Sequence, residues 1–224
     1  AERLARRGAV TFETNHPSRW CAFNSAELVF DLDALVGAHD IHPFLHTRYC
    51  NALTDEHGRI TAAVIENKNG RSAIRANVFI DASGDGDLAA HQGIPFTVAE
   101  DLQPPTVCAL LHDFGRPDLD FRELYRQHRE EFGLPEDSGW HGPVPGLPAT
   151  SLFAETHVFG ANCADAEPLT RAEFEGRRQL RACIDMIRKY GPPDGAIGLH
   201  AIANHIGIRE TRRFEAEYCL TEAD

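Results

Sequence analysis

VFIDASGDGDLAA, residues 78–90, is the stretch of sequence that decides the predicted fold. Its first three residues are apolar and stop abruptly at Asp81, a pattern that predicts a strand buried on both faces of a sheet. A polar loop with Gly84 and Gly86 follows, and residues 88–92 are expected to form a short helix. A strand, a glycine loop and a helix in this order are typical of α/β nucleotide-binding proteins.

The loop from Asp81 to Asp87 offers both backbone and carboxylates to a ligand. Gly84 and Gly86 let the backbone approach a ligand without a Cβ in the way. Asp85 and Asp87 can accept hydrogen bonds from sugar hydroxyls, as acids do beside ribose in dinucleotide sites. A strand-to-helix turn in which an aspartate caps the following helix is the alternative that stays open.

A metal ion is not expected in this chain. From Asp81 the loop copies the start of a calcium loop, D-x-S-x-D-G-D, but its twelfth position is Gln92 where calcium binding needs a bidentate Glu. The residues before Asp81 also predict a strand, where a calcium loop follows a helix. The 12 histidines form near pairs only, and none lies at a recognised ligand spacing from a cysteine or carboxylate.

Antiparallel strands are expected before this stretch. Residues 44–53 and 60–66 are rich in β-forming side chains and flank an Asp-Glu-His-Gly turn. Asn69 and Gly70 are expected to supply the two positive φ values of a tight hairpin. A third strand returns through residues 72–76, so the sequence predicts an antiparallel meander.

A proline-rich region and a long helix follow. Residues 97–169 are interpreted as a loop-rich unit with short strands and one amphipathic helix, 121–132. The clearest helix is 170–190, opened by a capping box from Thr170 to Glu173 and ended by Gly191. Helical spacing predicts the buried stripe of this helix: Leu180, Cys183, Ile184 and Ile187.

Composition narrows the classes of function and the compartment. The 34 acidic residues against 22 Lys and Arg give a net charge of -12, which disfavours nucleic-acid binding and docking on anionic membranes. No stretch approaches the ~20 consecutive apolar residues of a membrane span. The 6 widely spaced cysteines are expected to be reduced, small apolar residues. No export segment is visible, so a soluble, cytoplasmic protein is expected.

Both ends of the chain predict incomplete helices. Residues 1–7 have the form of the last turns of a helix, with Gly8 as its left-handed cap. Thr221 to Asp224 have the form of a helix start. The chain is therefore expected to be an internal fragment of a longer protein.

Three arginines stand close together in HIGIRETRRFEAEYCLT, residues 205–221. Arg209, Arg212 and Arg213 can clamp a carboxylate or stabilise another planar anion, because the guanidinium fork matches such groups. Ordinary ion pairs with the neighbouring glutamates are the alternative that stays open.

Four stretches of the chain together resemble a known family, the FAD-dependent oxidoreductases related to fumarate reductase flavoprotein subunits and to the wider glutathione-reductase-like flavoprotein fold. They occur in the family's order. The stretches are ENKNGRSAIRANVFIDASGDGDLAAHQGIPF (66–96), QPPTV (103–107), LTRAEFEGRRQL (169–180) and GIRETRRFEAEYCLTEAD (207–224).

The resemblance implies an α/β fold, a partial FAD/NAD(P)-binding-type three-layer domain with an inserted α+β substrate domain. It implies a partial FAD-binding domain with the meander at 1–96, a substrate or insert domain at 97–206, and a return to the FAD-binding domain at 207–224. The region 30–44 departs from the family, which would place a fuller helix there.

The resemblance also implies FAD as the cofactor and hydride transfer between flavin and an organic, anionic small-molecule substrate. The family's G-x-G-x-x-G turn would precede Ala1 and the segment covering the isoalloxazine would follow Asp224, so FAD binding by this chain alone is expected to be weak. A non-catalytic flavoprotein remnant or a binding module without cofactor is the alternative, and a homo-oligomer stays open.

Site residues follow from this comparison with the family. The cofactor side is expected at Asp81, Ser83, Gly84 and Asp85. Arg209 and Arg213 are the candidates for holding an anionic substrate or polarising the flavin. His205 is the candidate proton donor, because it lies beside the arginines and histidines exchange protons near neutral pH.

Overall fold

The computed structural model describes residues 1–224 apart from 16, 18–19, 195–196, 219–220 and 222–224. The chain divides into two compact units. Unit 1 comprises Ala1–Ile41 and Gln103–Arg209, and unit 2 comprises His42–Leu102 and Glu210–Asp224. The helix start expected at the C-terminus falls largely outside the described residues.

The compact units do not share the bounds of the predicted domains. Residues 1–41 group with 103–209, whereas the predicted division keeps 1–96 together. A compact unit is defined by packing and a predicted domain by its role, so the division at residues 96 and 206 stays a prediction.

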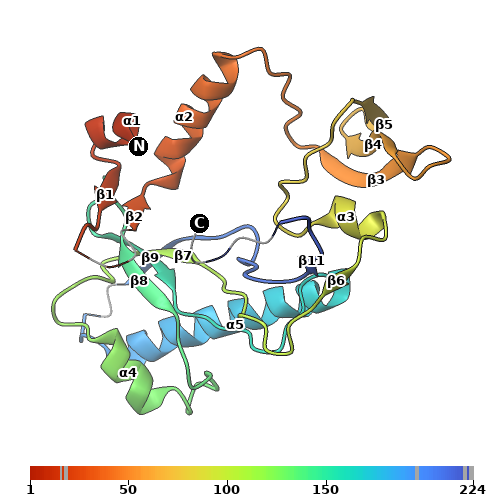
Figure 1. The fold of residues 1–224 in the computed structure, drawn as a ribbon. Helices are drawn as coiled ribbons and strands as arrows, with labels where there is room; N and C mark the ends of the chain where they lie inside the picture. The colour runs from red at the N-terminus through yellow and green to blue at the C-terminus, as the bar shows by residue number, and fades with distance from the viewer. Residues whose placement is uncertain (16, 18–19, 195–196, 219–220, 222–224) are drawn as a thin grey trace. The chain divides into compact units, whose positions relative to one another are not determined.

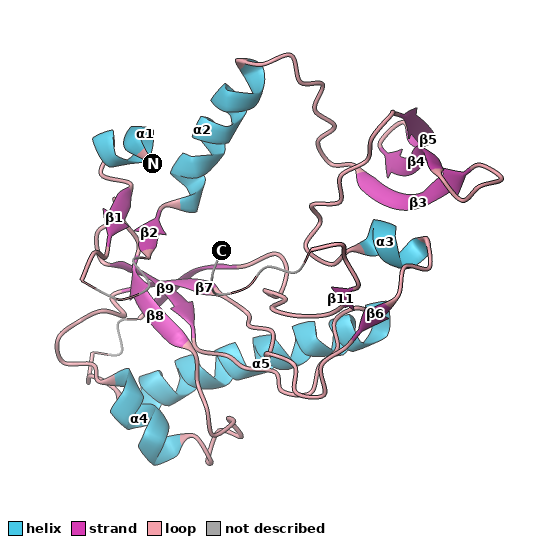
Figure 2. Ribbon diagram, in the orientation of Figure 1, coloured by secondary structure: helices cyan, strands magenta, loops and turns pink. Residues whose placement is uncertain are grey.

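Unit 1 is built on a four-stranded antiparallel sheet with the order β10-β7-β9-β8. Figures 1 and 2 label three of these strands, β7, β8 and β9. The strands are β7 (Ala109–His112), β8 (Trp140–Pro143), β9 (Thr150–Ala154) and β10 (Gly198–Ile202). Because side chains alternate along a strand, Leu111 of β7 and Phe153 of β9 enter the core, and both are fully buried. The short strands agree with the loop-rich unit predicted for this part of the sequence.

The long helix α5 (Ala166–Tyr190) begins earlier than predicted. Its N-cap is Asp165, so the capping box expected at Thr170 is wrong. Pro168 does not prevent this earlier start, because it falls in the first turn, where a missing amide costs no helical hydrogen bond. Inside the helix the Thr170 hydroxyl donates to the carbonyl of Ala166 at 2.7 Å.

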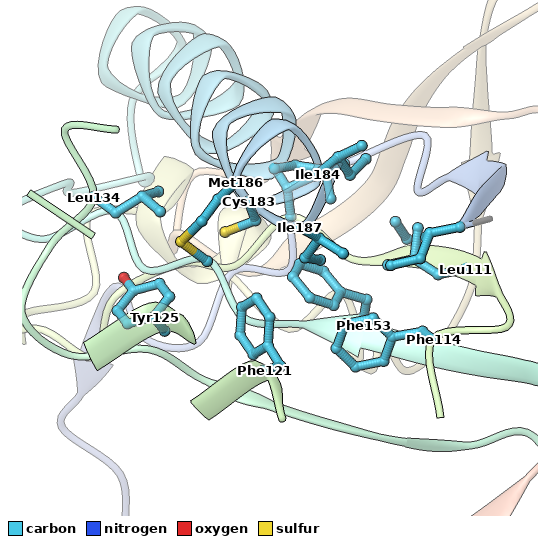
Figure 3. Close-up of a cluster of buried hydrophobic side chains, with 14 of the residues drawn as sticks. Leu111, Phe114, Phe121, Tyr125, Leu134, Phe153, Cys183, Ile184, Met186 and Ile187 are labelled. Carbon is cyan, nitrogen blue, oxygen red and sulfur yellow. The ribbon is translucent and has the colours of Figure 1, made fainter. Parts of the chain in front are cut away.

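The predicted buried stripe of α5 is confirmed. Figure 3 shows Cys183, Ile184 and Ile187 in the same apolar cluster as aromatic rings from the sheet and from α4 (Phe121–His128). The ring of Phe153 lies 5.1 Å from that of Phe114 and 5.3 Å from that of Phe121, centroid to centroid. Interlocking of this kind gives unit 1 a dense apolar core.

Helix α4 is shorter than the predicted 121–132. Asp120 caps its start by accepting a hydrogen bond from the amide of Glu123 at 3.0 Å. Beyond His128 the chain continues as turns closed by bonds between residues three apart, such as that from the amide of Phe132 to the carbonyl of Arg129 at 3.2 Å. Gly133 is left-handed (φ 60) and ends these turns, and the amide of Leu134 donates to the carbonyl of Arg129 at 2.9 Å. A left-handed glycine with such a bond closes a helix.

The first part of unit 1 holds α1 (Glu2–Arg6), β1 (Val10–Phe12), β2 (Cys21–Phe23) and α2 (Ser25–Gly37). Gly8 is left-handed after α1, as predicted (φ 66). Strands β1 and β2 pair antiparallel. Helix α2 is capped by the side chain of Asn24 and continues to Gly37 with no buried residue, so a regular helix fills much of the region where the family comparison indicated shortening.

Unit 2 contains the predicted meander, β3 (Arg48–Thr54), β4 (Ile60–Asn67) and β5 (Gly70–Arg75), in the order β3-β4-β5. The hairpin between β4 and β5 differs from the prediction in its turn. Gly70 is left-handed (φ 95), whereas Asn69 does not have a positive φ. The side chain of Asn67 accepts a hydrogen bond from the amide of Asn69 at 3.0 Å, which stabilises a turn without a left-handed asparagine.

The buried strand predicted at residues 78–80 is wrong. The segment is not assigned as a strand, and Val78 and Ile80 are 74% and 86% exposed. A strand buried on both faces needs hydrogen-bonded neighbours and a covering layer on each side. Within the part of the chain that the structure describes, no strand pairs with residues 78–80, so apolar composition alone does not bury them.

Distant parts of the sequence meet in the remainder of unit 2. The predicted short helix is α3 (Asp87–His91), one residue earlier than expected. Strand β6 (Phe96–Thr97) pairs antiparallel with β11 (Arg213–Phe214), and Phe214 lies opposite Phe96. This short pairing carries the segment from Thr211 to Phe214 to the glycine loop.

Candidate functional site

The carboxylate of Asp81 organises the first half of the glycine loop. Its Oδ1 accepts hydrogen bonds from the Ser83 amide at 3.0 Å and the Ser83 hydroxyl at 2.7 Å. Its Oδ2 accepts one from the amide of Leu88, in the first turn of α3, at 3.1 Å. These bonds, led by that of the Ser83 hydroxyl, lower the pKa of Asp81. Asp81 thus bridges the loop and caps the helix, the role that the sequence left open for an aspartate.

The two glycines of the loop have different surroundings. Gly84 is exposed and left-handed (φ 95), and a Cβ built there would meet no atom within 4 Å. Gly86 is also left-handed (φ 64), but a Cβ there would collide with the ring of Phe214. Gly84 therefore leaves space beside the backbone, whereas Gly86 is packed against β11.

Two side chains from residues 211–212 hold the second half of the loop. The hydroxyl of Thr211, a buried residue, donates to Oδ1 of Asp85 at 3.3 Å. Nη1 of Arg212 donates to the carbonyl oxygen of Asp85 at 3.2 Å and to Oδ1 of Asp87 at 2.8 Å. The guanidinium carbon of Arg212 lies 5.7 Å from the centre of the Phe96 ring.

Tyr49 on β3 brings a hydroxyl close to the same carboxylates. Its ring stacks on His91 of α3 with the centroids 5.6 Å apart. The hydroxyl is buried and has no hydrogen-bond partner among the described residues. Burial, followed by the charges of Asp81 and Asp87, raises the pKa of this phenol. A buried donor without a partner is costly, so this hydroxyl is available to a ligand or an ordered water.

The structure gathers the four cofactor-side candidates within unit 2. Arg213, also in unit 2, forms an ion pair with Glu210 and has a 66% exposed side chain. For this arginine the ordinary ion pair is therefore observed.

Arg209 and His205 belong to unit 1 and are exposed. Among the described residues, the Arg209 side chain has no hydrogen bond or ion pair. Burial raises the pKa of the nearby Cys108 thiol, and the charge of Arg209 opposes this shift.

Two residues of the loop's surroundings were not selected from the sequence. Arg212 was recognised as one of three arginines, but nothing in GIRETRRF distinguishes it from Arg213 before β11 is placed. Tyr49 lies in a run of β-forming residues, where an aromatic side chain is ordinary. Its unpartnered hydroxyl is visible only in three dimensions.

The described residues hold neither a membrane-spanning helix nor a metal-binding group. No helix in the described part of the chain has both the length and the apolar character needed to cross a membrane. Nor do any three His, Cys, Asp or Glu side chains among those residues gather as a metal-binding group.

Comparison with curated proteins gives no match to this chain. The profile of a family described as FAD dependent oxidoreductase matches residues 1–224, the whole sequence. The family agrees with the resemblance carried by the glycine loop and the arginine segment, and with the mixture of helices and sheets in the fold. The chain belongs to the FAD dependent oxidoreductases, a family of redox proteins whose cofactor is FAD.

Proposed function

We propose that the protein transfers hydride between FAD and an organic, anionic substrate, and that the loop from Asp81 to Asp87 contacts the cofactor. The family supports redox chemistry with FAD, and the transfer of hydride and the class of substrate are the proposal. The observation that carries the loop's role is the space at Gly84, which is exposed, left-handed and free of any atom within 4 Å of a Cβ position. Backbone of this kind accommodates a ligand at close range.

The polar groups of the loop and of its surroundings suit a hydroxyl-bearing portion of FAD. The carboxylate of Asp85 has one oxygen bonded to Thr211 and is only partly buried, so it can accept a hydrogen bond from a ligand hydroxyl. The unpartnered hydroxyl of Tyr49 can donate one. Asp81 and Ser83 bond to each other, and we assign them the shaping of the loop.

Bound FAD supplies the two-electron chemistry. For the substrate side we propose Arg209, whose exposed guanidinium can hold a carboxylate, and His205 as the proton donor. Arg213 is the weaker candidate for the substrate, because the carboxylate of Glu210 already neutralises it, and we assign it no contact with FAD.

The test replaces Asp85 in the full-length protein and uses Asp101 as the matched control. Asp101 is an exposed acid outside the loop. Asp85→Ala should raise the Kd for FAD about tenfold, as expected when a hydrogen bond to a charged group is lost. Asp101→Ala should leave it unchanged, with bound flavin measured from its absorption spectrum after dialysis. Equal retention in both variants would remove the loop from the cofactor site, and a full-length protein that binds no FAD would reject the proposed function.

A further inference from the structure

We propose that Arg212 is the positioning residue of the glycine loop and holds it in the shape that receives the cofactor. The inference rests on the proposed function. Its basis is the pair of bonds from a single nitrogen, Nη1, to the carbonyl of Asp85 and the carboxylate of Asp87. These two groups flank Gly86, so the guanidinium spans the left-handed residue from one side to the other.

The two halves of the loop have separate anchors. Asp81 fixes the first half through Ser83 and reaches α3 through Leu88. It has no bond to the peptides at residues 84–86. Glycine adopts positive and negative φ about equally well, so the φ of 64 at Gly86 needs an external restraint to be kept. Arg212 provides that restraint.

Arg212 is itself held in place. Its side chain is 11% exposed, and its guanidinium lies over the ring of Phe96. The neighbouring residues Arg213 and Phe214 pair with β6, and the Phe214 ring occupies the space beside Gly86. The donor is therefore ordered by β-pairing and ring packing before any ligand arrives, which is the condition for positioning.

Arg213 provides a matched control one residue away. It carries the same side chain and begins β11 directly after Arg212, but it is 66% exposed and its partner is Glu210. An exposed ion pair of this kind contributes little to stability. Any effect specific to the loop should therefore appear at Arg212 and not at Arg213.

The experiment compares Arg212→Ala and Arg213→Ala in the full-length protein with two measurements. One is the Kd for FAD by equilibrium dialysis, and the other is amide hydrogen exchange over residues 81–92 without cofactor. Arg212→Ala should raise the Kd about tenfold, because bonds from a charged group are lost, and should speed exchange. Arg213→Ala should keep the Kd within about twofold of the unaltered protein, as expected for an exposed ion pair.

Two further variants distinguish positioning from simple packing. Arg212→Lys keeps a charged donor and should recover part of the FAD affinity and of the exchange protection. Arg212→Met keeps an apolar stem without a donor and should behave like Arg212→Ala. If the alanine variant does not fold, the comparison of Arg212→Lys with Arg212→Met still tests the proposal.

Three results would overturn the proposal: equal losses at Arg212 and Arg213, equal behaviour of the Lys and Met variants, or weaker FAD binding with unchanged exchange in the loop. Absence of FAD binding by the unaltered protein would reject the proposed function instead. The exchange measurements would then still decide whether Arg212 orders the loop.

Discussion

The core around α5 and the glycine loop keep their shapes by different means. In unit 1, Leu180, Cys183 and Met186 are almost completely buried against the sheet and α4. Among the described residues of unit 2, only Ala62, Ile65 and Thr211 are buried. The core is thus stabilised by apolar burial, which many residues share, whereas the loop depends on a few polar contacts made by Asp81 and Arg212. Single substitutions should therefore affect stability in the core and ligand-binding geometry in the loop.

The largest expected effect is that of Phe153→Ala. The side chain is fully buried and packs on Phe114 and Phe121, so its removal should cost roughly 3–5 kcal/mol of unfolding free energy. Urea unfolding measures the loss. Leu152→Ala, at a partly exposed position on the same strand, is the control and should cost less. A similar cost for both variants would mean that this core is not closely packed.

The next largest effect is expected for Gly86→Ala. A side chain in the left-handed region costs about 1–2 kcal/mol, and here the new Cβ would also collide with Phe214. Gly84→Ala is the control, because it meets the left-handed strain without the collision. Gly86→Ala should therefore speed hydrogen exchange in residues 81–92 more than Gly84→Ala. The reverse order would show that β11 does not support the loop.

A smaller effect is expected from the helix caps of unit 1. Asp120 accepts a capping hydrogen bond at the start of α4, so Asp120→Ala should cost about 1 kcal/mol of unfolding free energy. Asp165 is the N-cap of α5 without a side-chain capping bond, and Asp165→Ala should cost clearly less. Equal costs in thermal unfolding would mean that the hydrogen bond at Asp120 contributes nothing.

The smallest effect concerns pH at Asp81. The folded loop lowers the pKa of this carboxyl, chiefly through the Ser83 hydroxyl. Its contribution to stability is therefore present above the unfolded pKa of about 3.9 and is lost as pH falls through the lower folded value. Because Asp81 is exposed, we expect a local change. The protection of residues 81–92 against exchange, measured relative to the intrinsic rate at each pH, should fall more between neutral and acidic pH in the unaltered protein than in Asp81→Asn. An identical pH dependence in both proteins would contradict this role.

The sequence predicted those elements whose side-chain pattern reports burial or turn formation directly. The stripe of α5 follows helical spacing, and the meander of β3 to β5 follows alternating β-forming runs and their turns. The failure at Val78 to Ile80 has the same origin. An apolar run expresses a preference for burial, but it does not supply the neighbouring strands that burial requires.

The loop was recognisable from its glycines and acids, but its supporting contacts were not. Arg212 and Asp87 are 125 residues apart, and no local pattern relates them. Nor does local sequence separate Arg212, which contacts the loop, from Arg213, which pairs with Glu210. That distinction depends on the pairing of β11 with β6.

The composition of unit 2 from two distant segments has a consequence for protein synthesis. Residues 42–102 leave the ribosome well before Thr211 to Phe214, which must emerge before the loop can acquire its second anchor. At about 5–20 residues per second, the 125 residues that follow Asp87, up to and including Arg212, take roughly 6–25 seconds to translate. During that interval unit 1 is still receiving the strands and helices from residues 103–209. The glycine loop therefore takes its final form only after residues 103–209 have been translated, and a ribosome that stalls before residue 212 leaves it without Arg212.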